Sequence, residues 1–73
     1  MWIKNGTTLV NSNHIDDMWI GREGDALATR YYFDGRMCSK ALYINNNVDV
    51  VAEKLNLIAE AISHYKGFVD ISD

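Results

Sequence analysis

Cysteine is almost absent from this 73-residue chain, which carries Cys38 as its only thiol. One cysteine cannot form an internal disulfide, and it excludes the usual cysteine-rich zinc site. A single thiol also suits a reducing compartment. A domain of this length buries only about 60% of its unfolded surface and often needs a staple. With disulfides and structural zinc excluded, oligomerisation is the staple that we expect.

Long apolar runs are missing as well. No stretch approaches the roughly 20 apolar residues that span a bilayer, and the start, MWIKNG, lacks the order of a secretory signal. We therefore expect a cytoplasmic protein with no membrane partner. Seven basic against ten acidic residues give a formal charge of -3. Because non-specific binding to a long nucleic acid needs a basic face, the charge argues against such a partner.

Catalytic and cofactor motifs are also missing. None of the glycines forms a phosphate-cradling loop at a helix start, which excludes P-loop and Rossmann sites. Cys38 with His14 or His64 is a conceivable thiolate and base pair, but a Cys38 placed mid-strand in a core is a small apolar residue. His14, Asp16 and Asp17 match no metal-binding loop pattern. We expect no enzyme, no cofactor and no metal site.

Turn signals are what the chain does contain. Asn5-Gly6, Glu23-Gly24 and Asp34-Gly35 each separate two short apolar runs, and Asn-Gly and Asp-Gly favour the type I′ turn of a two-residue hairpin. A turn or one short helical turn is expected at 11–14, where residues that bond their own backbone gather. Proline, repeats and linkers are absent. These signals predict one domain over 1–73 with an antiparallel sheet of four to five strands.

A C-terminal amphipathic helix is predicted from Val48 to Lys66. The helix cap comes from Asn45–Asn47, and the negative charge of Asp49 suits the positive end of the helix dipole. Gly67 fits the left-handed position that follows the helix. Its apolar residues recur at helical spacing: Val48, Val51, Leu55, Ile58, Ile62 and Tyr65, widened by Ala52 and Ala59. This stripe is expected to pack on the sheet, which gives an α+β fold, and residues 68–71 are expected to form a short edge strand.

The register of the Asp34-Gly35 hairpin sorts the sheet's side chains onto two faces. If these two residues form the turn, Tyr31 opposes Cys38 and Ala28 opposes Ala41. The first face is then mainly aliphatic and suited to the helix, with Leu27, Tyr31, Cys38, Leu42 and Ile44 among its members. The second face is aromatic, with Trp19, Arg30, Tyr32, Met37 and Tyr43. A sheet with one dry and one wet face alternates cleanly between apolar and polar residues, and this one does not.

The second face has the residue types that dominate binding hot spots. Three explanations stay open: Trp2 and Phe68 or the first hairpin cover it, a second copy covers it, or another partner binds it. Aromatic rings beside Arg30 can also stack a nucleobase. We therefore predict a non-enzymatic homo-oligomer, with a dimer favoured, that acts by binding protein. The alternative is a binder or sponge for a small nucleotide-like ligand, with sites at the protomer interface.

The order of the segments resembles that of known small proteins. The opening MWIK-NG-TTLVN, the apolar strand, the hairpin and the helix are similar to small uncharacterised proteins of Gram-positive bacteria and their phages. Those share an Ile-Lys-turn-Leu-Val-Asn start and an Ala/Glu/Ile-rich helix like Val51 to Ile62. The resemblance implies a compact strands-then-helix domain carried on a mobile element. In that setting the partner is a host protein, and the chain is expected to inhibit a host defence system.

Overall fold

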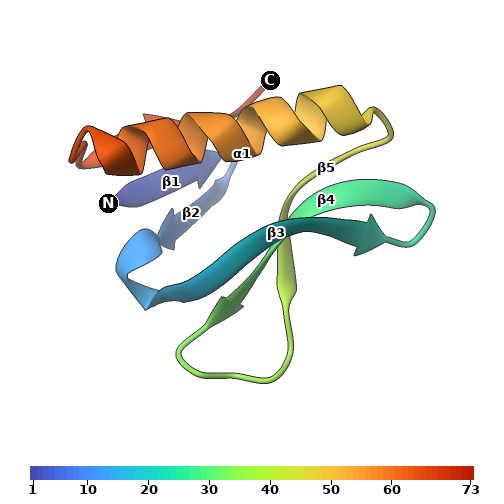
Figure 1. Ribbon diagram of the computed structural model, residues 1–73, viewed down its shortest axis with the longest axis horizontal. Coiled ribbons are helices and arrows are strands. Elements are labelled where there is room, and N and C mark those ends of the chain that lie inside the picture. Colours follow the sequence, from blue (N-terminus) through green and yellow to red (C-terminus); the bar gives the residue numbers. More distant parts are fainter.

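The computed structural model describes all 73 residues as six strands, one 3-10 turn and one α-helix (Figure 1). In chain order they are β1 (Trp2–Asn5), β2 (Thr8–Asn11), η1 (Ser12–His14), β3 (Ile15–Glu23), β4 (Ala26–Phe33), β5 (Lys40–Asn45), α1 (Val48–Ser63) and β6 (Phe68–Asp70). The α+β class, the turn near 11–14, the C-terminal helix and the short strand after it are confirmed. No helix has the length and apolar character that crossing a membrane requires.

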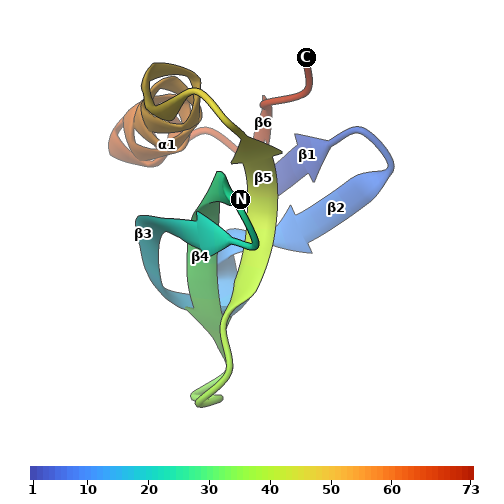
Figure 2. The same ribbon diagram turned by 90° about the vertical axis from the view of Figure 1, so that its right-hand side faces the viewer.

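The strands form two three-stranded sheets, so the prediction of a single sheet of four to five antiparallel strands is wrong. One sheet has the order β2-β1-β6 and the other the order β3-β4-β5. β6 runs parallel to β1, because α1 carries the chain back to the start of β1, as parallel pairing requires. In Figure 2, β1 and β2 lie to the right of β5. β3 and β4 lie to the left of β5, and α1 lies above β3 and β4. Asn5 joins the sheets by donating from Nδ2 to the carbonyl of Leu42 over 2.7 Å.

The three predicted turns form, but their details differ. The two-residue loops of the first two hairpins are Gly6-Thr7 and Gly24-Asp25, one residue later than predicted. In each, only the glycine has a positive φ, which is the type II′ pattern. At Asp34-Gly35 both residues have positive φ, as a type I′ turn requires. The partner strand nevertheless begins only at Lys40, so residues 34–39 form a longer loop.

The longer loop changes the register between β4 and β5. Tyr31 pairs with Lys40 and not with Cys38. A β-bulge after Thr29 then adds one more residue of shift, so that Thr29 pairs with Tyr43. The total displacement from the predicted register is an odd number of residues, and an odd shift moves side chains to the opposite face of the sheet.

Three predicted placements are therefore wrong. Tyr43 was expected on the aromatic face and is buried in the core. Ile44 was expected toward the helix and is about half exposed. Cys38 was expected mid-strand in the core and is exposed in the 34–39 loop.

The core lies where α1 covers the two sheets. Its buried members are Ile3, Tyr31, Leu42, Tyr43, Val51, Ile58 and Ile71. α1 packs against β3, β4 and β5 of one sheet and β6 of the other. The start of the helix is capped as predicted, because the Asn47 side chain accepts the N–H of Asp49 over 2.9 Å. One helix thus closes a core to which both sheets contribute.

The buried side of α1 is rotated from the predicted stripe. Val51 and Ile58 are buried as expected, but so is Ala61, which lies outside the predicted stripe. Val48 and Ile62 are about half exposed instead. Because α1 covers two sheets, its buried side is centred between Val51, Ile58 and Ala61, and the Ile62 side is left at the margin.

The helix ends one turn earlier than predicted, in a Schellman motif. Lys66 donates its N–H to the carbonyl of Ala61, and Tyr65 donates to that of Ile62, both over 3.0 Å. The left-handed residue of the motif is Tyr65, with φ of 55°, and not Gly67 as predicted. This conformation costs an L residue about 1 kcal/mol or more. The Tyr65 side chain makes no compensating burial, since it is 95% exposed.

Candidate functional site

Three of the five residues predicted for the binding face lie together on the outer face of the β3-β4-β5 sheet. Trp19 pairs with Arg30 across β3 and β4. The rings of Trp19 and Tyr32 pack with centroids 4.8 Å apart and an interplanar angle of 42°. Alternation along β4 places Arg30 and Tyr32 on the same face. All three side chains are partly exposed.

Met37 and Tyr43 do not join this surface. Met37 lies in the 34–39 loop and is 94% exposed. Tyr43 is turned into the core by the bulge, which Thr29 braces: its hydroxyl accepts the backbone N–H of Tyr43 over 3.0 Å. The binding role of the five residues stays a prediction, but they do not form one surface.

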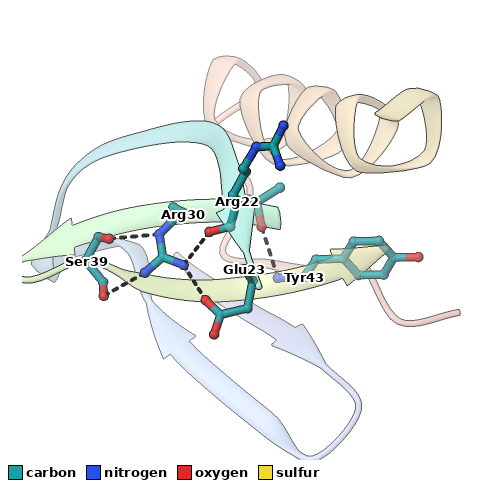
Figure 3. Close-up of polar contacts among 6 residues, drawn as sticks. Arg22, Glu23, Arg30, Ser39 and Tyr43 are labelled. Atoms are coloured by element: carbon teal, nitrogen blue, oxygen red, sulfur yellow. Dashed lines mark hydrogen bonds and ion pairs between the residues drawn. The ribbon is translucent and has the colours of Figure 1, made fainter. Parts of the chain in front are cut away.

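Arg30 is held by the chain itself (Figure 3). Its Nε donates to the hydroxyl of Ser39 over 2.9 Å, and its Nη2 donates to the Ser39 carbonyl over 3.1 Å. Its Nη1 donates to the carbonyl of Arg22 over 3.0 Å and pairs with the Glu23 carboxylate. A guanidinium has five N–H donors, so these contacts leave one for a ligand. In the structure Arg30 ties the 34–39 loop to the end of β3.

Gly21 leaves the space that the Arg30 side chain crosses. A Cβ at this position would lie 2.9 Å from Arg30 Cδ and 3.1 Å from Trp19 Nε1. Carbon atoms in van der Waals contact are about 3.5–4.0 Å apart, so no other residue fits without displacing both side chains. The Trp19–Arg30 surface is therefore close-packed over Gly21.

The polar residues that the sequence suggested for chemistry brace the hairpin end. His14 Nδ1 lies 2.9 Å from a carboxylate oxygen of Asp34. The Asp16 carboxylate accepts the N–H of Gly35 over 2.8 Å. No group of three or more His, Cys, Asp or Glu side chains lies together as a metal site would require. These contacts hold the Asp34-Gly35 turn against the start of β3.

Tyr43 anchors the last residues of the chain. Its hydroxyl donates to a carboxylate oxygen of Asp73 over 2.7 Å, and Lys54 Nζ lies 3.4 Å from the same oxygen. The hydrogen bond from Tyr43, followed by the contacts with Lys54, holds the pKa of Asp73 below its usual range. The same hydrogen bond is the main reason that the pKa of Tyr43 is raised.

A second apolar surface, which we did not predict, covers the outer face of the β2-β1-β6 sheet. Its apolar members, each about half exposed, are Trp2, Leu9 and Phe68. Trp2 pairs with Phe68, and Leu9 pairs with Lys4, which shares the outer face with Trp2. Trp2 and Phe68 therefore belong to this Trp2–Leu9–Phe68 face rather than to a cover over Trp19. The parallel pairing of β6 with β1, which brings Trp2 and Phe68 together, has no local signal in the sequence.

An apolar groove runs between α1 and the first half of β3. Its volume is about 280 Å³. Its apolar lining consists of Ile3, Ile15, Met18, Leu55, Ile58, Ala59 and Ile62, and its polar lining of Ser12, Asp16 and Asp17. Within the predicted helix stripe, Ile58 is buried in the core and also borders the groove. Leu55 and Ile62 are not part of the buried core and line the groove.

No protein-family model, curated protein or solved structure matches this chain. The Trp2–Leu9–Phe68 face and the groove along β3 are open and apolar. On the Trp19–Arg30 surface, which also includes Tyr32, the Arg30 side chain fills part of the space that a partner would need.

Proposed function

We propose that this chain is a non-enzymatic protein that acts by binding protein surfaces and that it self-associates. The Trp2–Leu9–Phe68 face carries the proposal. Three large apolar side chains stand about half exposed on one sheet face, where a sheet face in contact with water usually carries polar residues. Full burial of such a side chain contributes about 1.5–3 kcal/mol, so covering these side chains with a partner would stabilise the complex.

The composition of the face suits a protein partner. Trp2 and Phe68 offer large, rigid contact areas of the kind found in interface cores. Lys4 and Asp70 form an exposed ion pair over 3.6 Å beside them. Apolar anchors next to exposed charges resemble the core and rim of an interface.

The remaining polar side chains support binding over catalysis. His14, Asp16 and Asp34 brace a turn, and Arg30 ties a loop to β3. These groups are engaged in holding the fold, which makes them less available to move protons or attack a substrate. This is the basis on which we place a binding role first.

Two more specific ideas stay proposals. One is that the bound protein belongs to a host defence system, which makes the chain a phage or mobile-element inhibitor. The other is a small nucleotide-like ligand bound between protomers, which we place second because Arg30 has one N–H left to offer. A ligand at a hundredfold its Kd adds about 2.7 kcal/mol to stability, so a thermal-shift screen of nucleotides tests the second idea.

The main proposal is tested by placing a charge on the apolar face. Phe68→Lys and Leu9→Lys change exposed side chains and should leave the circular dichroism spectrum unchanged. Immobilised wild-type protein should retain a protein from host extract that both variants lose. Ile44→Lys is the matched control, because Ile44 is equally exposed on the other sheet. Equal retention by wild type and both variants would contradict the proposal.

A further inference from the structure

β3 is a long strand with one unpaired edge. It spans Ile15–Glu23 and has β4 as its only neighbour in the sheet, and in Figure 2 it lies on the outer side of β4, away from β5. Proteins commonly protect such edges with lysine or proline, because an open edge pairs with other strands. β3 contains neither residue. The bulge at Asp16 and the charged residues of β3 lie near its two ends, so the segment 18–21 between them is open to another strand.

The hairpin geometry indicates which backbone groups point outward. The Gly24-Asp25 loop joins the pair Glu23 and Ala26, and a two-residue hairpin closes on a hydrogen-bonded pair. Alternation from that pair directs the N–H and C=O groups of Met18, Ile20 and Arg22 away from β4. None of the backbone hydrogen bonds outside the helices and strands involves these groups. The Arg22 carbonyl accepts from Arg30, so Met18 and Ile20 keep both groups free.

The charges along β3 are self-complementary. Asp16 and Asp17 stand near its start and Arg22 near its end. The side chains of Asp16 and Arg22 make no ion pair within the chain, although the Asp16 carboxylate accepts the N–H of Gly35. In an antiparallel pair of β3 strands related by a two-fold axis at Trp19, Asp16 of one copy lies opposite Arg22 of the other. The same register places Met18 opposite Ile20, so the free backbone groups meet as hydrogen-bonded pairs.

From these relationships we infer that the open edge of β3 binds β3 of a second copy, antiparallel and centred on Trp19. The inference rests on the self-association in the proposed function and names its surface. If the second strand is shifted by two residues so that Asp17 lies opposite Glu23, two negative charges face each other, which is unfavourable. A shift of two residues in the opposite sense places Asp16 opposite Ile20, and Arg22 then has no carboxylate opposite it. The central register alone satisfies both the charges and the backbone.

The groove between α1 and β3 accommodates the second copy's side chains. Ile20 is 37% exposed and lies on the same face of β3 as Met18, which lines the groove. In the paired strands, Ile20 of each copy lies beside Met18 of the other, at the apolar groove. Arg22 of each copy lies opposite Asp16 of the other, at the end of the groove that Asp16 and Asp17 line, next to the bulge at Asp16. Apolar and charged contacts thus agree on one arrangement.

Charge exchange on β3 tests the inference. Light scattering coupled to size exclusion should give wild-type protein a mass twice that of the 8.3 kDa chain. Arg22→Asp and Asp16→Arg, each first shown by circular dichroism to be folded, should each weaken the dimer about tenfold, because each places like charges opposite one another. Mixing the two variants should restore the dimer, since the exchanged charges then oppose each other. If neither substitution weakens the dimer, or if mixing the two variants does not restore it, the inference is wrong.

Blocking the edge provides a second test. Ile20→Lys places a charge at the groove, and the fold should survive because the side chain is partly exposed. It should yield monomers, whereas Ile44→Lys, on the far strand of the same sheet, should remain dimeric. A dimer that tolerates Ile20→Lys would refute the β3 interface but leave the self-association of the proposed function in place. A wild-type monomer at every concentration would refute both, while binding through the Trp2–Leu9–Phe68 face would remain open to its own test.

Discussion

Tyr43 and Asp73 are joined by a hydrogen bond of 2.7 Å that links the middle of β5 to the last residue of the chain. Lys54 of α1 approaches the same carboxylate, and its ammonium lies 5.0 Å from the centre of the Tyr43 ring. Strand, helix and final segment therefore meet at one ionised group. Because Ile71, two residues earlier, is fully buried, this group helps to hold a core residue in place.

The first prediction concerns acid unfolding. The pKa of Asp73 is lowered in the folded chain, chiefly by the Tyr43 hydrogen bond, so its contribution to stability is present above the ordinary carboxyl pKa. The contribution is lost as pH falls through the lowered folded-state pKa. Urea unfolding at a series of acidic pH values should therefore show a shallower loss of stability for Asp73→Asn than for wild type.

The companion variant is Tyr43→Phe, which keeps the ring but removes the hydrogen bond to Asp73. That variant should also show a shallower loss of stability than wild type. Asp70 also has a lowered pKa, mainly from hydrogen bonds with Ser72, so Asp73→Asn should reduce the slope without abolishing it. Identical slopes for wild type and Asp73→Asn would contradict the prediction.

The second prediction concerns Gly21 and the Arg30 side chain above it. Gly21→Ala introduces a Cβ 2.9 Å from Arg30 Cδ, in the middle of a side chain whose guanidinium is fixed by several bonds. The clash should lower the free energy of unfolding by about 1–3 kcal/mol, the usual cost of overpacking. Chemical denaturation measures it, and Gly67→Ala is the control, because nothing lies near its Cβ.

A double-mutant cycle distinguishes this clash from a backbone effect. With Arg30→Ala present, the added methyl group meets no Arg30 stem, so Gly21→Ala should cost much less. Residues in contact commonly show interaction energies of about 0.5–3 kcal/mol in such cycles. Additive effects of the two substitutions would mean that Arg30 does not cross Gly21.

The third prediction concerns Tyr65, the left-handed residue that ends α1. Tyr65→Gly removes the penalty of a positive φ and should raise the free energy of unfolding by about 1 kcal/mol relative to Tyr65→Ala, which keeps that penalty. Both variants lose the same exposed ring, so their difference isolates the backbone term. Equal stability of the two variants would show that the helix does not end in this conformation.

Local signals in the sequence predicted much of the fold. Glycine and asparagine mark turns and caps by their own conformational preferences, so the three hairpin regions and the Asn47 cap could be found without knowing their neighbours. The periodicity from Val51 to Ile58 likewise identifies a helix and part of its buried side. Trp19, Arg30 and Tyr32 could be placed on one face because their alternation depends on β3 and β4 alone.

The remaining features depend on contacts between distant segments. The pairing of β6 with β1 joins the two ends of the chain, and it divides the strands into two sheets that no local pattern distinguishes. The burial of Ala61 follows from the helix covering both sheets. The placement of Tyr43 depends on a single bulge residue, and one inserted residue inverts every side chain beyond it.

The fourth prediction tests that bulge directly. Thr29 is fully buried, and its hydroxyl accepts the N–H of Tyr43 over 3.0 Å, the contact marked at Tyr43 in Figure 3. Thr29→Val keeps the shape of the side chain but leaves that N–H without an acceptor, which should cost about 1–3 kcal/mol. Thr29→Ser keeps the hydroxyl and loses one methyl group, so it should retain the hydrogen bond. In amide hydrogen exchange, the Tyr43 N–H should lose protection in Thr29→Val and keep it in Thr29→Ser. If Thr29→Val kept that protection, the backbone of β4 would have to be the acceptor, and the register that buries Tyr43 would be wrong.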